Sequence, residues 1–129
     1  MNNYGIINCS LKNLQYNFTK PNIEQIKITI NDEIQITQVF DNKARLMISR
    51  SLHFGPDTNS YVNVVFEVII DNDDDITKES LIKALKKDIV CLTSVFAKIS
   101  VLISQVTGLS LFSPLVTAPS YDPAHTKIE

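Results

Sequence analysis

The chain contains 129 residues, of which 44% are hydrophobic and 20% charged, and its formal net charge is −2. This composition is typical of one folded domain with a substantial hydrophobic core, and it excludes a disordered chain. The slightly acidic balance also argues against a nucleic-acid-binding protein, because contacts to phosphates require a basic surface.

Hydrophobic residues at every second position predict four β-strands in the first half of the chain. In the first strand the alternation shifts by one residue between Leu11 and Leu14, which indicates a β-bulge. The second strand keeps its phase as far as Phe40, although Asp32 interrupts the hydrophobic row. The expected strands cover residues 5–20, 24–40, 43–54 and 60–71.

Short connections between these consecutive amphipathic strands favour an antiparallel meander with one face in the core. An acidic run, Asp71-Asn72-Asp73-Asp74-Asp75, follows the last strand. Such a run can hold a hard cation, but this one lacks the spacing, the glycine and the distal Glu of an EF-hand loop. We therefore interpret it as an exposed turn whose last acid caps the following helix.

A long helix is predicted over residues 76–107, and Lys87-Asp88 offers a place where it can break into two helices. One apolar stripe recurs at a period close to 3.5, and further apolar residues widen it into a second face. One face can pack on the strands, whereas the other requires a cover from another subunit. The residues expected at that subunit interface are Val95, Ile99, Leu102, Ile103 and Val106.

Residues 108–121 predict an apolar extended segment, because Pro114 and Pro119 prevent further helix. This segment has to lie against the protein, over the helix or along a groove beside it. Together with the aromatic residues of the strands, it predicts an apolar groove that binds other polypeptides. The candidate groove residues are Tyr16, Phe18, Phe40, Phe54, Leu109, Leu111, Phe112 and Leu115. Residues 122–129 are expected to form a frayed polar tail.

The sequence offers few groups for catalysis. His53 and His125 have no nucleophile elbow near them, and the chain contains no glycine-rich phosphate loop. Cys9 and Cys91 lack the clustered partners that zinc requires, so we interpret them as buried, reduced thiols. We therefore expect no enzyme, no cofactor and no metal site.

The expected location is the cytoplasm. The N-terminal residues lack the basic region and the apolar run of a secretory signal. Lys98 and several hydroxyl side chains lie inside the predicted helix, which argues against a membrane span.

Several short motifs resemble those of the SecB export chaperone family. That family's helix carries an aromatic-Ala-Arg step and ends in a glycine, which Phe96-Ala97-Lys98 and Gly108 resemble at the same separation. Its next segment reads roughly Phe-Pro-x-Leu-x-Leu-Ala-Pro-x-Asn-Phe, and residues 112–121 are similar to it with one residue fewer. In the first strand, residues 12–17 (Lys-Asn-Leu-Gln-Tyr-Asn) resemble the family's Lys-Asp-Ile-Ser-Phe-Glu.

The resemblance implies an α+β fold in one domain over residues 1–129, which assembles as a homotetramer built from two dimers with the helices between the sheets. It also implies an ATP-independent holdase that binds unfolded client polypeptides in apolar grooves. In export members of the family the clients pass to the SecA motor ATPase. Asn13 and Asn17 replace two acidic residues of the SecA-docking surface, which disfavours SecA as a partner here. A dedicated chaperone of one client, such as the antitoxin of a toxin–antitoxin system, is the other expectation.

Two further classes of function stay open from the sequence. One is a small-ligand-binding or enzymatic α+β domain, which requires an enclosed cavity with convergent polar groups. The other is a structural accessory protein with one fixed protein partner.

Overall fold

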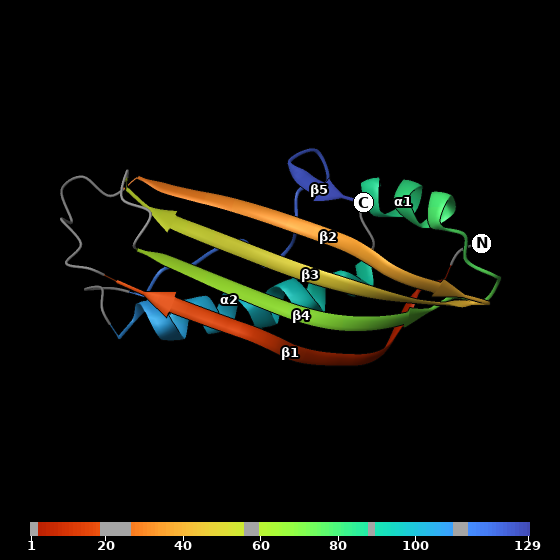
Figure 1. Cartoon of the computed structure of the whole chain (residues 1–129), viewed down its shortest axis with the longest axis horizontal. Coiled ribbons are helices and arrows are strands. Elements are labelled where there is room, and N and C mark those ends of the chain that lie inside the picture. The colour runs from red at the N-terminus through yellow and green to blue at the C-terminus, as the bar shows by residue number, and fades with distance from the viewer. Residues whose placement is uncertain (1–2, 19–26, 56–59, 88–89, 110–113) are drawn as a thin grey trace.

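The computed structural model describes residues 3–18, 27–55, 60–87, 90–109 and 114–129. A five-stranded sheet has the strand order β1-β4-β3-β2-β5, and α2 lies across one face of it, behind β4 in Figure 1. The elements, in chain order, are β1 (Gly5–Asn17), β2 (Ile28–Phe40), β3 (Lys43–Phe54), β4 (Tyr61–Asp71), α1 (Lys78–Lys86), η2 (Val90–Leu92), α2 (Thr93–Thr107) and β5 (Thr126–Ile128). This architecture confirms the predicted α+β class.

The predicted meander holds for β2, β3 and β4 but is wrong for β1. β1 pairs antiparallel with β4, from Gly5 opposite Asp71 to Asn17 opposite Tyr61, and so lies at the sheet edge away from β2. The two-residue period determines which face each side chain occupies, but it carries no information about which strands are neighbours.

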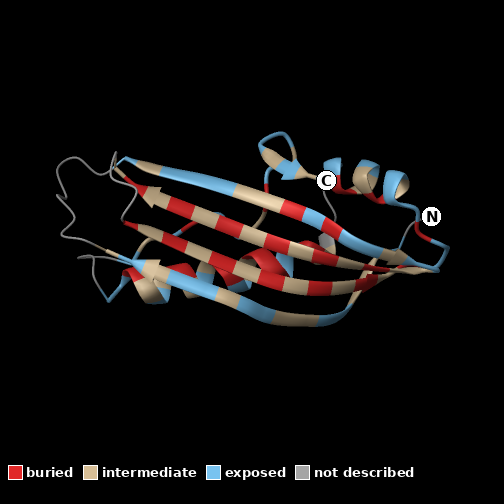
Figure 2. Cartoon of the chain, in the orientation of Figure 1, coloured by how far each residue is buried: buried red, intermediate tan, exposed pale blue. Residues whose placement is uncertain are grey.

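The hydrophobic core lies on the face of the sheet that α2 covers. Along β3 and β4 every second residue is buried and the residues between them are half-buried, as the alternating bands in Figure 2 show. The two strands that flank this pair, β1 and β2, are much more exposed. Fully buried side chains from the helices complete the core, among them Leu81, Leu85, Phe96, Ile99 and Ile103.

Register shifts set the phase of the outer strands. The bulge predicted in β1 is present, because the register shifts between Leu11 and Asn13. Two further shifts, between Ile6 and Asn8 of β1 and between Ile36 and Gln38 of β2, were not expected. The shift in β2 places Phe40 opposite Lys43, on the face away from the core, so the prediction that Phe40 shares the face of Ile36 is wrong.

The predicted helix is divided into α1 and α2 by the short 3₁₀ helix η2, so the alternative with a break is correct and the continuous helix is wrong. The proposed break point is only partly visible, since residues 88–89 lie outside the described residues. The cap of α1 also differs from the prediction. Thr77, rather than the last acid of the run, accepts a hydrogen bond from the Ser80 amide at 3.1 Å and forms a capping box with it. No helix of the described residues is long and apolar enough to cross a lipid bilayer.

The C-terminal residues do not form a frayed tail. Thr126–Ile128 add the short strand β5, parallel to β2, with Ile128 opposite Ile34. The Ile36 amide donates to the Glu129 carbonyl at 2.7 Å, and the Glu129 amide donates to the Ile34 carbonyl at 3.1 Å. The prediction failed because it considered only the polarity of the segment, whereas backbone hydrogen bonds to an open sheet edge hold it in place.

We predict that deleting residues 126–129 lowers the free energy of unfolding by about 1–3 kcal/mol. The deletion removes the pairing of β5 with β2 and the two backbone hydrogen bonds of Glu129, and it removes the half-buried Ile128 side chain. Urea denaturation measures the change, with Lys127→Ala as a control because that side chain is exposed. A deletion variant as stable as the full chain would show that β5 contributes nothing to the fold.

Candidate functional site

The two flanks of α2 have different surroundings. Ser100 and Thr107 hold the segment 114–121, which we call the strap. Ala97, Val101 and Leu102 project from a different flank of the helix, toward β1. One flank of α2 is therefore covered by the chain itself, and the other is open.

An apolar groove lies on the open flank, between α2 and the two strands β1 and β4. It has a volume of about 480 Å³, and its lining residues are Leu11, Phe66, Ala97, Lys98, Val101 and Leu102. Leu11 is 45% exposed and Val101 is 56% exposed, values that are high for large aliphatic side chains beside a core. The groove therefore offers apolar surface that a bound partner can remove from water.

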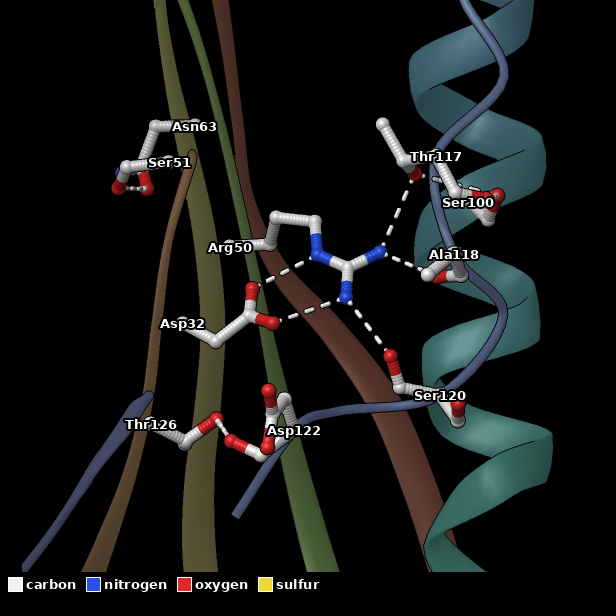
Figure 3. Close-up of polar contacts among 10 residues, drawn as sticks. All are labelled: Asp32, Arg50, Ser51, Asn63, Ser100, Thr117, Ala118, Ser120, Asp122 and Thr126. Atoms are coloured by element: carbon white, nitrogen blue, oxygen red, sulfur yellow. Dashed lines mark hydrogen bonds and ion pairs between the residues drawn. The ribbon is translucent and has the colours of Figure 1, made fainter. Parts of the chain in front are cut away.

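Arg50 of β3 fastens the strap to the sheet (Figure 3). Its side chain is only 2% exposed, and its Nε and Nη2 atoms donate to the two carboxylate oxygens of Asp32 at 2.7 and 2.9 Å. The remaining N–H groups donate to the Thr117 hydroxyl, the Ala118 carbonyl and the Ser120 carbonyl at 3.1, 2.6 and 3.1 Å. All five guanidinium donors thus have an acceptor, which a buried arginine requires.

Aromatic rings extend this attachment toward α1. The Arg50 guanidinium carbon lies 5.3 Å from the centre of the Phe96 ring, within the range of a cation–π contact. Phe96 stacks on Tyr121 with ring centres 5.2 Å apart, and the Tyr121 hydroxyl donates to the Leu85 carbonyl at 2.6 Å. Through Tyr121 the end of the strap therefore joins α1 and α2.

The pairing of Arg50 with Asp32 was not predicted, although the sequence carries a signal for it. Both residues occupy core-facing positions of the alternating pattern, between Ile48 and Leu52 in one strand and between Ile30 and Ile34 in the other. Two opposite charges at core positions of consecutive strands predict a buried ion pair if those strands are neighbours.

The predicted groove residues do not form one site. The rings of three of them lie together. The ring centres of Tyr16 and Phe18 are 5.0 Å apart, and those of Phe18 and Phe54 are 4.6 Å apart. Phe54, however, is buried in the core. Phe40 lies at the opposite end of β2 from Ile28, the residue that pairs with Phe54.

The predicted groove residues that follow α2 also lie elsewhere. Leu109 is 80% exposed just beyond α2, and Leu115 is half-buried against the core. Leu111 and Phe112 lie outside the described residues. None of the described residues predicted for a client groove lines the groove between α2 and β1, although Leu102, which was predicted at a subunit interface, does.

The predicted subunit-interface residues need a correction. Val95, Ile99 and Ile103 are completely buried in the core of their own chain, so no surface of these side chains is left for a second subunit. The sequence period identified an apolar stripe but not which part of it the chain's own sheet covers. Leu102 and Val106 are half-buried and retain accessible surface.

Burial and hydrogen bonding shift the pKa values of two groups that bear on the chemistry of the chain. Burial raises the pKa of the Cys91 thiol, which makes it a poorer nucleophile, and both Cys9 and Cys91 are free. A hydrogen bond from His125 lowers the pKa of Asp122 in the exposed turn before β5. No group of three or more metal-ligating side chains occurs among the described residues.

Comparison with known proteins identifies the fold. No protein-family model and no curated protein matches the sequence. Among solved structures, the chain is similar to the Mycobacterium tuberculosis Rv1957 SecB-like chaperone in complex with a ChAD peptide from the Rv1956 HigA1 antitoxin. The match has a TM-score of 0.67 at 16% sequence identity and covers 89% of this chain and 88% of that one. The chain has a SecB-like fold.

Within this SecB-like fold, we predict that Arg50→Met lowers the free energy of unfolding by about 3–5 kcal/mol. The substitution leaves the Asp32 carboxylate without its partner, and it leaves the strap carbonyls of Ala118 and Ser120 without their donors. Urea denaturation measures this loss, and amide hydrogen exchange should accelerate in residues 115–121.

The double variant Arg50→Met with Asp32→Leu is the matched control. It should recover part of the lost stability, because no unpaired charge is left in the core. If the two substitutions are simply additive, Arg50 and Asp32 are not energetically coupled.

Proposed function

We propose that this protein is an ATP-independent chaperone that holds non-native segments of other polypeptides in the groove between α2 and β1. The observation that carries the proposal is the open apolar groove, whose lining includes the exposed side chains of Leu11 and Val101. The SecB-like fold supports it, since a SecB-like chaperone with that fold has been solved with an antitoxin peptide. Its activity is binding rather than catalysis, and its proposed location is the cytoplasm.

The size of the groove suits a short extended segment. Complete burial of one apolar side chain contributes about 1.5–3 kcal/mol. Two or three client side chains, offset by the loss of freedom on binding, therefore correspond to roughly micromolar affinity or weaker. A holdase requires such reversible binding.

The proposed client is a dedicated partner, such as the antitoxin of a toxin–antitoxin system, rather than a range of exported proteins handed to SecA. Asn13 and Asn17 lie on β1, opposite Val65 and Tyr61, and neither carries the negative charge expected of a SecA-docking surface. The antitoxin peptide of the structural neighbour supports the choice of client. Pulldown with mass spectrometry tests it: one dominant partner is expected, and many unrelated unfolded proteins would contradict it.

An alternative function, a small-ligand-binding or enzymatic domain, requires an enclosed cavity with convergent polar groups. The groove described here is open, and five of its six lining residues are apolar. This geometry favours a polypeptide over a small polar metabolite. A structural accessory protein would bind its fixed partner in the same groove. The pulldown distinguishes this function from that of a chaperone, because a fixed partner would copurify in its folded form.

The assembly proposed for this chaperone is a homotetramer built from two dimers. We assign the subunit contacts to the half-buried Val106 of α2 and to the exposed apolar residues Ile7 and Leu14 of β1. Light scattering after size-exclusion chromatography should give about four times the 14.5 kDa mass of one chain. A monomer at tens of micromolar concentration would contradict the proposed assembly.

We predict that Val101→Asp abolishes most of the protein's ability to prevent aggregation of an unfolded client without nucleotide. The substitution places a carboxylate in the apolar groove, so a client side chain would have to desolvate it, and client affinity should fall at least about tenfold. Stability should change little, because Val101 is already largely exposed.

The matched control is Val116→Asp, which makes the same change on the strap, where the side chain is 82% exposed and outside the groove. This variant should protect the client as well as the natural chain does. Light scattering of a heated or diluted client follows both variants, and their oligomeric masses are measured in parallel. Equal loss in both variants, or in neither, would remove the groove from the binding site.

A further inference from the structure

The edge of β2 that faces away from β3 holds a short strand from the C-terminal segment of the same chain. β5 contains three residues and pairs with β2 in parallel, whereas β2 contains 13 residues. The Glu129 amide donates to the Ile34 carbonyl at 3.1 Å, and the Ile36 amide donates to the Glu129 carbonyl at 2.7 Å. This edge lies on the opposite side of the sheet from β1 (Figure 1), so it is separate from the surfaces assigned to subunit contacts.

β5 leaves the first part of this edge uncovered. Among the described strands, none lies beside residues 28–31 on the side away from β3. Ile30 is opposite the buried Leu52 and so points to the core face of the sheet, yet it is 46% exposed. A parallel segment that stayed extended for two residues before the position of Thr126 would place a side chain opposite Ile30.

The chain's own segment does not extend in this direction, because it turns just before β5. The His125 amide donates to the Asp122 carbonyl at 3.0 Å, and the Thr126 hydroxyl donates to the same carbonyl at 2.7 Å. The strap that precedes this turn is fixed in place, since Arg50 donates to the Ser120 carbonyl. β5 is therefore a short occupant of a longer site, and a segment without this turn can cover more of β2.

The register of β5 shows which side chains the edge accepts. Ile128 lies opposite Ile34 and packs against the core, so this position takes an aliphatic residue. Lys127 lies opposite Glu33, on the face away from the core. Glu33 forms no ion pair with any residue that the structure describes, since Lys127 pairs with Glu129 at 3.6 Å instead. An acid without an ion-pair partner favours a basic residue at the cross-strand position.

We propose that the edge of β2 binds an extended segment of a partner polypeptide, which takes the place of β5. The segment carries aliphatic residues opposite Ile30 and Ile34 and a basic residue opposite Glu33. Backbone hydrogen bonds to the sheet edge provide affinity, and the three side-chain positions provide selectivity. β5 competes with the partner, because its attachment to the same chain gives it a high effective concentration. This site goes beyond the groove between α2 and β1, and it does not depend on whether that groove binds clients.

The test follows the binding of two blocked peptides with an uncharged fluorophore to the full chain by fluorescence anisotropy. The long peptide, Val-Thr-Thr-Lys-Ile-Glu, places Val opposite Ile30, and the short peptide, Thr-Lys-Ile-Glu, lacks the first two residues. Ile128→Asp removes the aliphatic contact of β5, so this variant should bind the long peptide at least about tenfold more tightly than the natural chain does. The same variant should bind the long peptide about tenfold more tightly than the short one, because only the long peptide covers Ile30.

The matched control is Ala124→Asp, which adds the same charge in the exposed turn before β5 and should bind the long peptide as the natural chain does. Urea denaturation checks that each variant is folded, and Ile128→Ser replaces Ile128→Asp if the latter is not. Replacing Lys by Glu in the long peptide should weaken binding about threefold, and Glu33→Gln should remove this difference.

Two N-methylated forms of the long peptide identify the backbone contact. The N–H of its Glu corresponds to that of Glu129 and points toward β2, whereas the N–H of the preceding Ile points away, because N–H groups alternate between the two edges of a strand. Methylation of the Glu nitrogen should abolish binding, and methylation of the Ile nitrogen should leave it unchanged.

Three results would overturn the proposal. If Ile128→Asp binds the long peptide no better than the natural chain does, or if both methylated peptides bind equally well, the edge of β2 is not the site. Equal binding of the Lys and Glu peptides would remove Glu33 as the source of selectivity. An oligomeric mass of Ile128→Asp below that of the natural chain, measured by light scattering, would show that β5 links copies of this chain and would assign the edge to a second copy.

Discussion

The burial of the Arg50 guanidinium is the constraint on which the covered side of this molecule depends. A buried arginine needs acceptors for all its donors, and Asp32 supplies only two of the five. The others come from Thr117 and from the carbonyls of Ala118 and Ser120, so the strap has to run past β3 at this point. That path places Tyr121 against Phe96 and brings the following residues to the edge of β2, where β5 forms.

The same arrangement explains why the other flank of α2 is open. The strap covers the flank that carries Ser100 and Thr107. No other described segment lines the flank that faces β1, and Leu11 and Val101 stay partly in water there. Exposed aliphatic surface of this kind contributes nothing to the stability of a single chain. Under the proposed function it is the surface that a second polypeptide covers on binding.

Features that depend on neighbours in the sequence could be predicted, whereas features that depend on contacts across the fold could not. Alternation revealed the strands, and its phase shift revealed the bulge after Leu11, because both are local properties of one strand. The place of β1 beside β4 and the docking of β5 on β2 result from pairing between distant segments. Arg50 shows the same limit: its charge at a core position is visible in the sequence, but its acceptors on the strap are not.

The sequence predicted accessible apolar surface on the apolar stripe of the helix, but in the structure this surface lies elsewhere. The sheet of the same chain hides Val95, Ile99 and Ile103 completely, because α2 packs directly beneath β4. The surplus lies instead on an edge strand and on the adjoining flank of α2. Among the described strands β1 pairs with β4 alone and so forms an edge of the sheet, and under the proposed function an extended segment would lie along this edge and its side chains. A groove with these two properties suits a client that has no fold of its own, because such a segment can lie along it in extended form.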